Sequence, residues 1–174
     1  ISFKVNKGEI FGIAGVAGNG QSELMDILTG ENINISSGEI IFNKNKIQNL
    51  GPQKRRDLSI SFVPENRLGH SAVPELSLSD NILLSQFPKN NFIKNGIILK
   101  NNVDDYANNV INEFKVITPG NDAKASSLSG GNLQKYVIGR EISAKPKILI
   151  ISHPTWGIDA GAEHSIRESL IDLS

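Results

Sequence analysis

The chain has 174 residues, of which 39% are hydrophobic, so it is long enough to bury one core and predicts a single domain. Its 18 Lys and Arg residues balance its 18 Asp and Glu residues, and this neutrality argues against nucleic acid as a partner. The absence of Cys excludes disulfides, thiolate metal sites and thiol nucleophiles. No apolar run approaches the roughly 18–20 residues of a membrane-spanning helix, and no signal peptide opens the sequence.

The first part of the chain predicts a strand, a loop and a helix. Ile1–Val5 alternates apolar and polar residues, and the mostly apolar run Glu9–Ala14 predicts a buried strand of a parallel sheet. The glycine-rich loop Gly15–Ser22 follows, and then a helix from Glu23 to Leu28 with Gly30 as its C-cap. This order is the context that a phosphate-binding loop requires.

The loop matches the phosphate-binding pattern G-x-x-x-x-G-K-S/T at every fixed position except one. Gln21 stands where the lysine belongs, and it keeps a hydrogen-bond donor but lacks the charge. Because a hydrogen bond to a charged group contributes about 1.5–3 kcal/mol, we expect weakened nucleotide binding. The competing interpretation is a glycine turn that binds nothing. The expected nucleotide-binding residues are Gly15, Gly18, Asn19, Gly20, Gln21, Ser22 and Glu23, with the Ser22 hydroxyl as a candidate Mg²⁺ ligand.

A small antiparallel layer, a short helix and a core strand are predicted next. Ser37–Lys46 predicts a strand entering a tight turn, and we expect it to pair with Ile1–Val5. Pro52–Leu58 predicts a basic helix with Pro near its first position, and Ile60–Glu65 predicts another core strand. The basic residues of the helix are interpreted as a solvated face rather than a binding patch. They are Lys54, Arg55 and Arg56.

From Leu68 to Ala125 the pattern becomes helical. A capped helix is predicted through Asn81–Leu84, and a longer one through Val103–Phe114 has apolar residues at i, i+3, i+4 and i+7. The Pro-, Asn- and Gly-rich stretch Gln86–Ile98 predicts a surface loop between them. His70 lies in a polar loop and is interpreted as solvent-exposed rather than catalytic.

A serine and two glycines stand directly before another run with helical spacing. Ser129, Gly130 and Gly131 precede it, and its apolar residues are Leu133, Val137, Ile138 and Ile142. This arrangement presents free backbone N–H groups and about half a positive charge at a helix N-terminus, with room for an anion. A bare S-G-G is also what a capped surface helix after a glycine turn would have.

The last part predicts an apolar strand, Ile148–Ile151, and a final helix, Ala160–Leu173. In a P-loop ATPase such a strand ends in an Asp that organises the metal ion. Here Ser152 and His153 follow it. His153 could polarise a water molecule, but we interpret the missing carboxylate as the sign of an inactive or slow site.

The sequence resembles the nucleotide-binding domain of ATP-binding-cassette (ABC) proteins in four stretches: Gly12–Leu24, Val63–Arg67, Leu128–Lys135 and His153–Ala162. More narrowly, it resembles the second cassette of the fused ATP-binding subunits of bacterial simple-sugar and nucleoside importers. That second cassette typically has an altered P-loop and lacks the Walker B carboxylates. The resemblance therefore agrees with the departures at Gln21, Ser152 and His153.

The resemblance implies an α/β fold: a P-loop NTPase core with a mainly parallel sheet, a small antiparallel β layer and an α-helical subdomain, truncated at both ends. The core lobe is expected at about 1–66 and 145–174, and the helical subdomain at about 67–144. The family's adenine-stacking aromatic is expected before the first residue, and its switch histidine after the last.

The resemblance also implies site residues. Cassettes of this family pair head to tail, and the signature loop of one contacts the γ-phosphate held by the P-loop of the other. The signature loop corresponds to Ser129, Gly130, Gly131, Asn132 and Gln134. Asp159 matches the D-loop aspartate, with Trp156 expected to pack beside that loop. Glu65 stands at the Q-loop position, where it could meet Mg²⁺ or pair with Arg67.

The implied function is ATP- and Mg²⁺-dependent import of a nucleoside or simple sugar. The expected partners are a second cassette on the same polypeptide, transmembrane permease subunits and, indirectly, a substrate-binding lipoprotein, at the cytoplasmic face of a bacterial membrane. Leu133 after Asn132 slightly favours a nucleoside. The alternatives are a regulatory nucleotide-binding module without ATPase activity and a non-transport ABC protein acting in translation or DNA repair.

Overall fold

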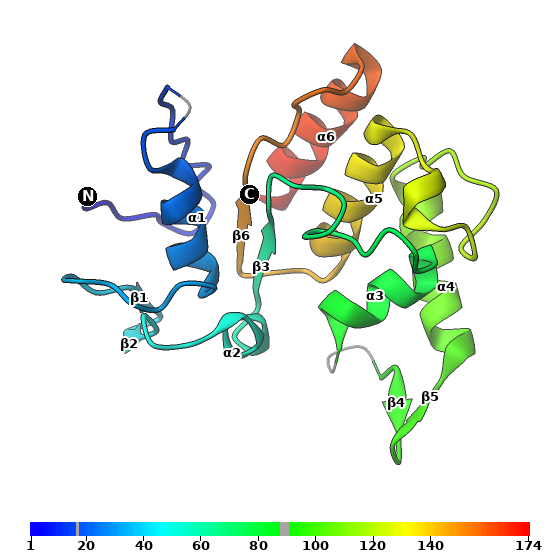
Figure 1. Ribbon diagram of the computed structural model, residues 1–174, viewed down its shortest axis with the longest axis horizontal. Helices are drawn as coiled ribbons and strands as arrows, with labels where there is room; N and C mark the ends of the chain where they lie inside the picture. The colour runs from blue at the N-terminus through cyan, green and yellow to red at the C-terminus, as the bar shows by residue number, and fades with distance from the viewer. Residues whose placement is uncertain (17, 88–90) are drawn as a thin grey trace.

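The computed structural model describes residues 1–16, 18–87 and 91–174. A parallel strand pair, β3 and β6, lies between an N-terminal part that contains α1 and a helical part that contains α3, α4 and α5 (Figure 1). The elements in chain order are α1 (Gln21–Thr29), β1 (Ile41–Phe42), β2 (Asn45–Lys46), α2 (Pro52–Asp57), β3 (Ile60–Val63), α3 (Leu78–Gln86), β4 (Ile93–Lys94), β5 (Ile97–Ile98), α4 (Lys100–Glu113), a 3₁₀ turn (Ala125–Ser127), α5 (Gly130–Ser143), β6 (Ile148–Ile151) and α6 (Ala160–Leu173).

The parallel pair brings two distant loops to one edge. Ile60 lies opposite Ile148, Val63 lies opposite Ile151, and the Ser152 N–H extends the ladder by donating to the Val63 carbonyl at 2.9 Å. All residues of β3 are buried, and α5 packs against it. Because parallel strands end at the same edge, the loop after β3 (residues 64–72) and the loop after β6 (residues 152–159) leave the sheet together.

The main hydrophobic core lies in the helical part. The apolar stripe predicted on the long helix is confirmed, because Val103, Ala107 and Val110 of α4 are buried. They pack in one cluster with buried residues of α3 and α5: Leu78, Ile82, Leu133, Tyr136, Val137 and Ile138. A Cβ at Gly139 would lie 2.5 Å from the ring of Phe114, so this glycine lets α5 approach the end of α4.

The two predicted N-terminal strands are absent from the structure. Residues 1–5 and 9–14 have no strand assignment and are exposed, although Phe3 and Phe11 stack with their ring centroids 5.0 Å apart. An apolar run becomes a strand only where a neighbour supplies ladder hydrogen bonds. Within the described part of the chain, no ladder joins residues 9–14 to the sheet, in which β3 and β6 pair only with each other.

The antiparallel layer also differs from the prediction. β1 pairs with β2 rather than with residues 1–5, and Phe42 lies opposite Asn45. The predicted tight turn is confirmed, because Asn43 and Lys44 both have positive φ, as a two-residue hairpin turn requires. Contact between neighbours in sequence therefore replaces the long-range pairing that we expected.

The predicted solvated face of α2 is wrong for both of its arginines, since the Arg56 side chain is also only 15% exposed. Lys54 is exposed, but Arg55 is fully buried and donates to the carbonyls of Ile27 at 2.5 Å, Leu28 at 2.7 Å and Leu50 at 2.8 Å. The last carbonyls of a helix lack intrahelical partners and carry partial negative charge. Arg55 therefore anchors the C-terminal end of α1, and burial lowers the pKa of its guanidinium.

The stretch predicted as a surface loop, 86–98, is more ordered than expected. α3 continues to Gln86, and a short hairpin pairs Ile93 with Ile98. Phe92 is buried and meets the ring of Tyr106 edge-on at 5.5 Å. Residues 88–90 of this prediction lie outside the described residues. Among the described residues, no helix has both the length and the apolar character needed to cross a bilayer.

Candidate functional site

The loop before α1 has the backbone geometry of an anion-binding turn. Gly18 and Gly20 have φ of 83° and 98°, a left-handed conformation that favours glycine. Gly20 occupies the N-cap position, and no side chain caps the helix. Ser22 and Glu23 are exposed, so the first N–H groups of α1 face solvent. This end of α1 fits the phosphates of a nucleotide.

Gln21 closes this loop on itself. Its side-chain Nε2 donates to the Val16 carbonyl at 2.9 Å, and its Oε1 accepts from the Asn19 N–H at 3.1 Å. A Cβ at Gly15 would lie 2.5 Å from the Gln21 Nε2, so glycine is needed there for the side chain to fold back. An incoming phosphate would compete with these bonds for the donors of the loop, without a lysine charge in return.

The end of β6 supplies no carboxylate toward such a site. His153 is exposed, has a φ of 49° and lies 6.1 Å from the Trp156 ring, centroid to centroid. No group of three or more His, Cys, Asp or Glu side chains in the described part of the chain is placed to hold a metal ion. Mg²⁺ prefers carboxylate and water ligands. Ser22 as a Mg²⁺ ligand therefore stays a prediction, with the remaining ligands to come from phosphate and water.

The start of α5 is a capped and exposed helix N-terminus. Ser129 is the N-cap, and its Oγ accepts from the Asn132 N–H at 3.4 Å and from the Asn132 Nδ2 at 3.0 Å. The Asn132 Oδ1 in turn accepts from the Ile117 N–H at 2.9 Å. Because Ser129 and Gly130 are exposed, the N–H groups that open the helix can reach an anion from outside the chain.

A junction of polar side chains surrounds this helix start. Gln134 is only 2% exposed; its Nε2 donates to the Pro154 carbonyl at 3.0 Å and its Oε1 accepts from the Arg67 Nε at 2.8 Å. Arg67 also donates through Nη2 to the Trp156 carbonyl. The loop after β3, the first turn of α5 and the loop after β6 therefore meet at one place.

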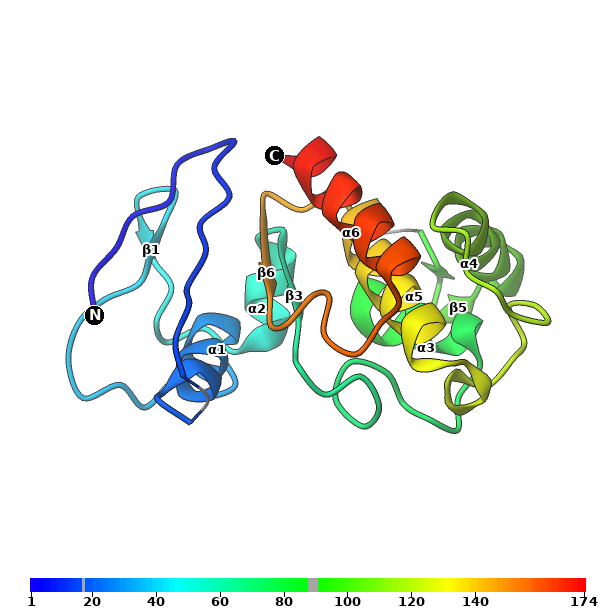
Figure 2. The same cartoon turned by 90° about the horizontal axis from the view of Figure 1, so that it is seen from above.

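Asp159 lies at the same junction. It is the N-cap of α6 and accepts from the Ala162 N–H at 2.9 Å, a bond that lowers the pKa of its carboxyl group. A Cβ at Gly131 would lie 3.5 Å from the Asp159 Oδ2. The structure thus brings the start of α5 and Asp159 together, whereas the loop of Gln21 lies on the other side of the β3–β6 pair (Figures 1 and 2).

Further predictions have clear outcomes in the structure. Trp156 is 67% exposed, so its ring packs less than predicted: it lies beside the His153 ring of the same loop, and its carbonyl accepts from Arg67. Of the alternatives for Glu65, pairing with Arg67 is excluded, since Arg67 bonds Gln134 and Trp156 instead. His70 is exposed, as expected, and pairs with Glu31 at 2.7 Å.

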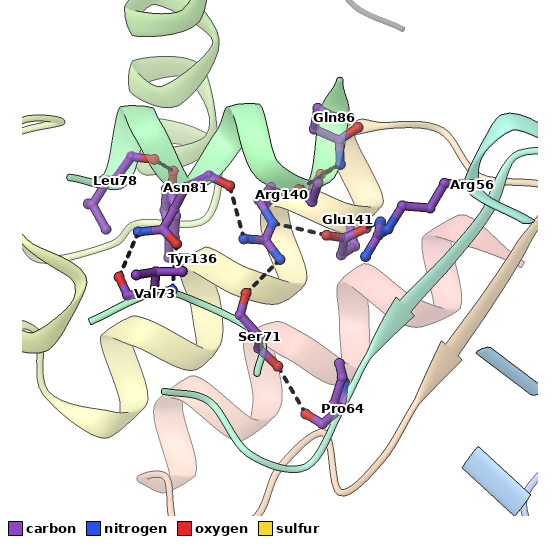
Figure 3. Close-up of polar contacts among 11 residues, drawn as sticks. Arg56, Pro64, Ser71, Val73, Leu78, Asn81, Gln86, Tyr136, Arg140 and Glu141 are labelled. Atoms are coloured by element: carbon purple, nitrogen blue, oxygen red, sulfur yellow. Dashed lines mark hydrogen bonds and ion pairs between the residues drawn. The ribbon is translucent and has the colours of Figure 1, made fainter. Parts of the chain in front are cut away.

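A buried charge network that the sequence did not predict anchors α5. Glu141 is fully buried between Arg140, at 2.9 Å from its Oε1, and Arg56, at 2.8 Å from its Oε2 (Figure 3). Arg140 donates to the carbonyls of Asn81 in α3, at 3.3 Å, and Ser71 in the loop after β3, at 2.9 Å. Arg56, Arg140 and Glu141, called the buried network below, join α5 to α2, α3 and that loop. An Arg-Glu pair within a helical run is the one signal that the sequence offered.

Comparison with known proteins gives one consistent result. The family model described as "ABC transporter" matches residues 1–156. The chain is 41% identical over 172 residues to the guanosine import ATP-binding protein NupO of Bacillus subtilis, and 40% identical over 171 residues to the nucleoside import ATP-binding protein NupA of Lactococcus lactis. It is 36% identical over 174 residues to the glucose import ATP-binding protein TsgD13 of Haloferax volcanii.

These matches cover 98–99% of this chain but only 32–34% of each relative, so the chain spans about a third of their length. Among solved structures, the ATP-binding cassette MJ1267 matches with a TM-score of 0.77 and 26% identity, over 99% of this chain and 69% of that one. The dimeric cassette MJ0796 bound to ADP and Pi matches with a TM-score of 0.78 and 22% identity, over 97% of this chain and 70% of that one. The latter likeness concerns the fold alone.

Proposed function

Because the chain belongs to the ABC transporter family, we propose that it is a nucleotide-binding cassette of an importer and couples ATP binding and hydrolysis to transport. In this proposal the chain's own phosphate-binding site is degenerate. Its signature loop, led by Ser129, Gly130 and Gly131, completes the site on the P-loop of a partner cassette. The core lobe takes about residues 1–66 and 145–174, and the helical subdomain about 67–144.

One observation carries this proposal: the two anion-binding helix ends of the chain differ in completeness. The end at α5 is capped, exposed and held by Gln134 against the loop after β6. At the end of α1, Gln21 folds back over its loop, and the residues after β6 are Ser152 and His153. A chain with one complete half-site is suited to serve a site that another chain supplies with lysine and carboxylates.

The proposed cofactors and partners follow from this arrangement. ATP binds at the partner's P-loop, where Mg²⁺ finds the carboxylate ligands that Ser152 and His153 replace in this chain, and it binds weakly at the loop of Gln21. The partner cassette belongs to the same polypeptide, in the roughly two thirds of its relatives' length that this chain does not span. Permease subunits and a substrate-binding lipoprotein complete the importer, with this chain at the cytoplasmic face of the membrane.

We propose a nucleoside as the imported substrate. Two relatives at 40–41% identity are named for guanosine and nucleoside import, whereas relatives named for glucose, ribose or xylose import share 32–38%. The second candidate function is a regulatory module that binds nucleotide without taking part in hydrolysis. The incomplete site at Gln21 and Ser152 favours that candidate if the start of α5 proves dispensable.

The test is Gly130→Asp in the assembled transporter. The new carboxylate would occupy the space where phosphate must approach, and would attract the Arg67 guanidinium, whose Nη1 lies 2.8 Å from a Cβ built at Gly130. We expect ATP hydrolysis to fall by at least about 100-fold, the size of the loss when one oxyanion-hole donor is removed. Gly120→Asp is the matched control, because a Cβ at Gly120 meets nothing within 4 Å. Activity retained in Gly130→Asp would favour the regulatory module.

A further inference from the structure

We propose that Arg67 is a positioning residue that holds the start of α5 and the loop after β6 in the relative placement needed for hydrolysis. The inference rests on the proposed function, since it concerns the same composite site. Arg67 acts through Gln134 and the Trp156 carbonyl rather than by touching the nucleotide.

The contacts of Arg67 join segments that are distant in sequence. Its Nε donates to the Gln134 Oε1 at 2.8 Å, and its Nη2 donates to the Trp156 carbonyl. A guanidinium offers these donors in a fixed planar fork, whereas a lysine offers a point charge on a flexible stem. The relative position of the two acceptors is therefore set by the geometry of one rigid group.

Gln134 passes the constraint from Arg67 to the loop after β6. The side chain of Gln134 is buried, its Oε1 is bound by Arg67, and its Nε2 donates to the Pro154 carbonyl at 3.0 Å. Without Arg67, the Oε1 loses its partner in a place that water reaches poorly. The Gln134 side-chain amide is then free to rotate toward another partner, and any rotation moves its Nε2 away from the Pro154 carbonyl.

Two glycines make room for the guanidinium. A Cβ at Gly130 would lie 2.8 Å from the Arg67 Nη1, and a Cβ at Gly157 would lie 3.6 Å from the Nη2. Gly130 opens α5, and Gly157 belongs to the loop after β6 and has a φ of 63°. The guanidinium is thus packed against both segments that it orients.

Stability alone does not explain a cation at this position. Arg67 lies beside the N-terminal end of α5, where the helix dipole disfavours positive charge. Among the described residues, Arg67 has no carboxylate partner to offset that cost, and its acceptors are a side-chain amide and a backbone carbonyl. Residues that break a local rule without a compensating gain concentrate at functional sites.

The experiment measures ATP hydrolysis by the assembled transporter carrying Arg67→Ala or Arg67→Lys. We expect Arg67→Ala to lower kcat by about 10- to 100-fold, the effect of a misplacement of about 1 Å in a catalytic arrangement. The KM for ATP should stay within about twofold, because the partner's P-loop holds the nucleotide. Arg67→Lys should lie in between, since it keeps the charge but not the fork. Arg167→Ala is the control: Arg167 is exposed and pairs only one turn away with Glu163, and it should behave as wild type.

A second comparison identifies the route of the effect. If Arg67 acts through Gln134, then Gln134→Ala lowers kcat by a similar factor, and the double variant is little worse than either single one. Multiplicative losses would show that the two side chains act independently and would overturn the proposed route.

The outcomes separate this inference from the proposed function. Wild-type kcat in both Arg67→Ala and Arg67→Lys overturns the positioning role, as does a loss that follows only a lowered thermal midpoint. If Arg67→Ala does not assemble, Arg67→Lys decides: wild-type kcat contradicts the inference, and a loss restricted to kcat supports it. Retained activity in Gly130→Asp contradicts the proposed function itself, whatever Arg67 does.

Discussion

Glycines stand at the N-terminal ends of both α1 and α5, and the two helix ends differ in what closes them. α1 starts after Gly20 with no side-chain cap, and Gln21 uses its amide to close the loop in front of it. α5 starts after Ser129, which caps it, and Gln134 one turn later is bonded to Arg67 and Pro154. A helix N-terminus can thus stay accessible to an anion, as in α5, or have the loop in front of it closed by a side chain of the helix, as in α1.

The two helices are also anchored by different residues. Arg55 holds the C-terminal end of α1, far from its glycine loop. The buried network holds α5 to α2, α3 and the loop after β3 through Glu141 and Arg140 (Figure 3). Both anchors lie near a helix C-terminus, since Arg140 stands in the last turn of α5; the start of α5 is held in addition by the bonds of Gln134 to Arg67 and Pro154. A helix start held in this way suits a group that must be placed accurately against another chain.

The largest expected effect comes from variants that restore the missing catalytic groups near the start of α1. In an assembly whose partner P-loop is disabled, we expect negligible ATP turnover from wild type and from Gln21→Lys. The triple change Gln21→Lys, Ser152→Asp and His153→Glu should raise turnover by at least about 100-fold, because it restores the groups that position metal and water. Phosphate release is the measurement. Turnover from Gln21→Lys alone would show that the missing carboxylates are not the defect.

A second change tests the difference in anchoring. Glu141→Ala should lower the free energy of unfolding by about 3–5 kcal/mol, because it leaves Arg140 and Arg56 as uncompensated charges at a buried site. Glu23→Ala in the exposed first turn of α1 should cost less than about 1 kcal/mol, the size of a helix-dipole contribution. Urea denaturation measures both. Similar losses would mean that the buried network contributes little to the stability of the fold.

A smaller effect is expected on the affinity of the loop before α1 for ATP. Gln21→Lys should tighten ATP binding by about 1–3 kcal/mol, because lysine adds a charge-assisted contact to the phosphates. Gln53→Lys on the exposed face of α2 adds the same charge elsewhere and should leave affinity unchanged. Titration calorimetry on the chain measures both variants. Unchanged affinity in Gln21→Lys would indicate that this loop does not bind phosphates.

Removal of the Ser129 side chain tests how much the N-cap of α5 contributes to stability. Ser129→Ala should lower the free energy of unfolding by about 1 kcal/mol, because the Asn132 N–H loses its acceptor. Ser22→Ala in the first turn of α1 removes an exposed hydroxyl that caps nothing and should be near neutral. Thermal unfolding measures the pair. A larger loss from Ser22→Ala would reverse the comparison.

The smallest expected effect is a pH dependence at Asp159. The Ala162 N–H lowers the pKa of its carboxyl group in the folded state, so the charge stabilises the fold above the unfolded pKa of about 3.9. That stabilisation is lost as the pH falls through the lower folded pKa. Asp159→Asn keeps the cap but not the charge, so it should be less stable than wild type at pH 7 and nearly equal to it once the pH has fallen below the folded pKa. Denaturation at a series of pH values measures the gap, and a constant gap contradicts the role of the charge.

The sequence by itself determined the features that depend on neighbours along the chain. It located the glycine loop and α1, the cap Ser129 and α5, the apolar stripe of α4 and the apolar strands β3 and β6. It also shows that Ser152 and His153, rather than carboxylates, follow β6. These features follow from local hydrogen bonding and from a hydrophobic period of a few residues, which a sequence displays without a fold.

Only the tertiary structure decided where the charged side chains go and which runs become strands. Arg55 was predicted to be solvated but is buried, and Arg67 reaches Gln134, 67 positions away in sequence. Glu141 meets Arg56 across 85 positions, and residues 9–14 stay outside the sheet. A buried charge or a strand is stable only when a partner supplies its hydrogen bonds, and the packing of distant segments determines whether that partner is present.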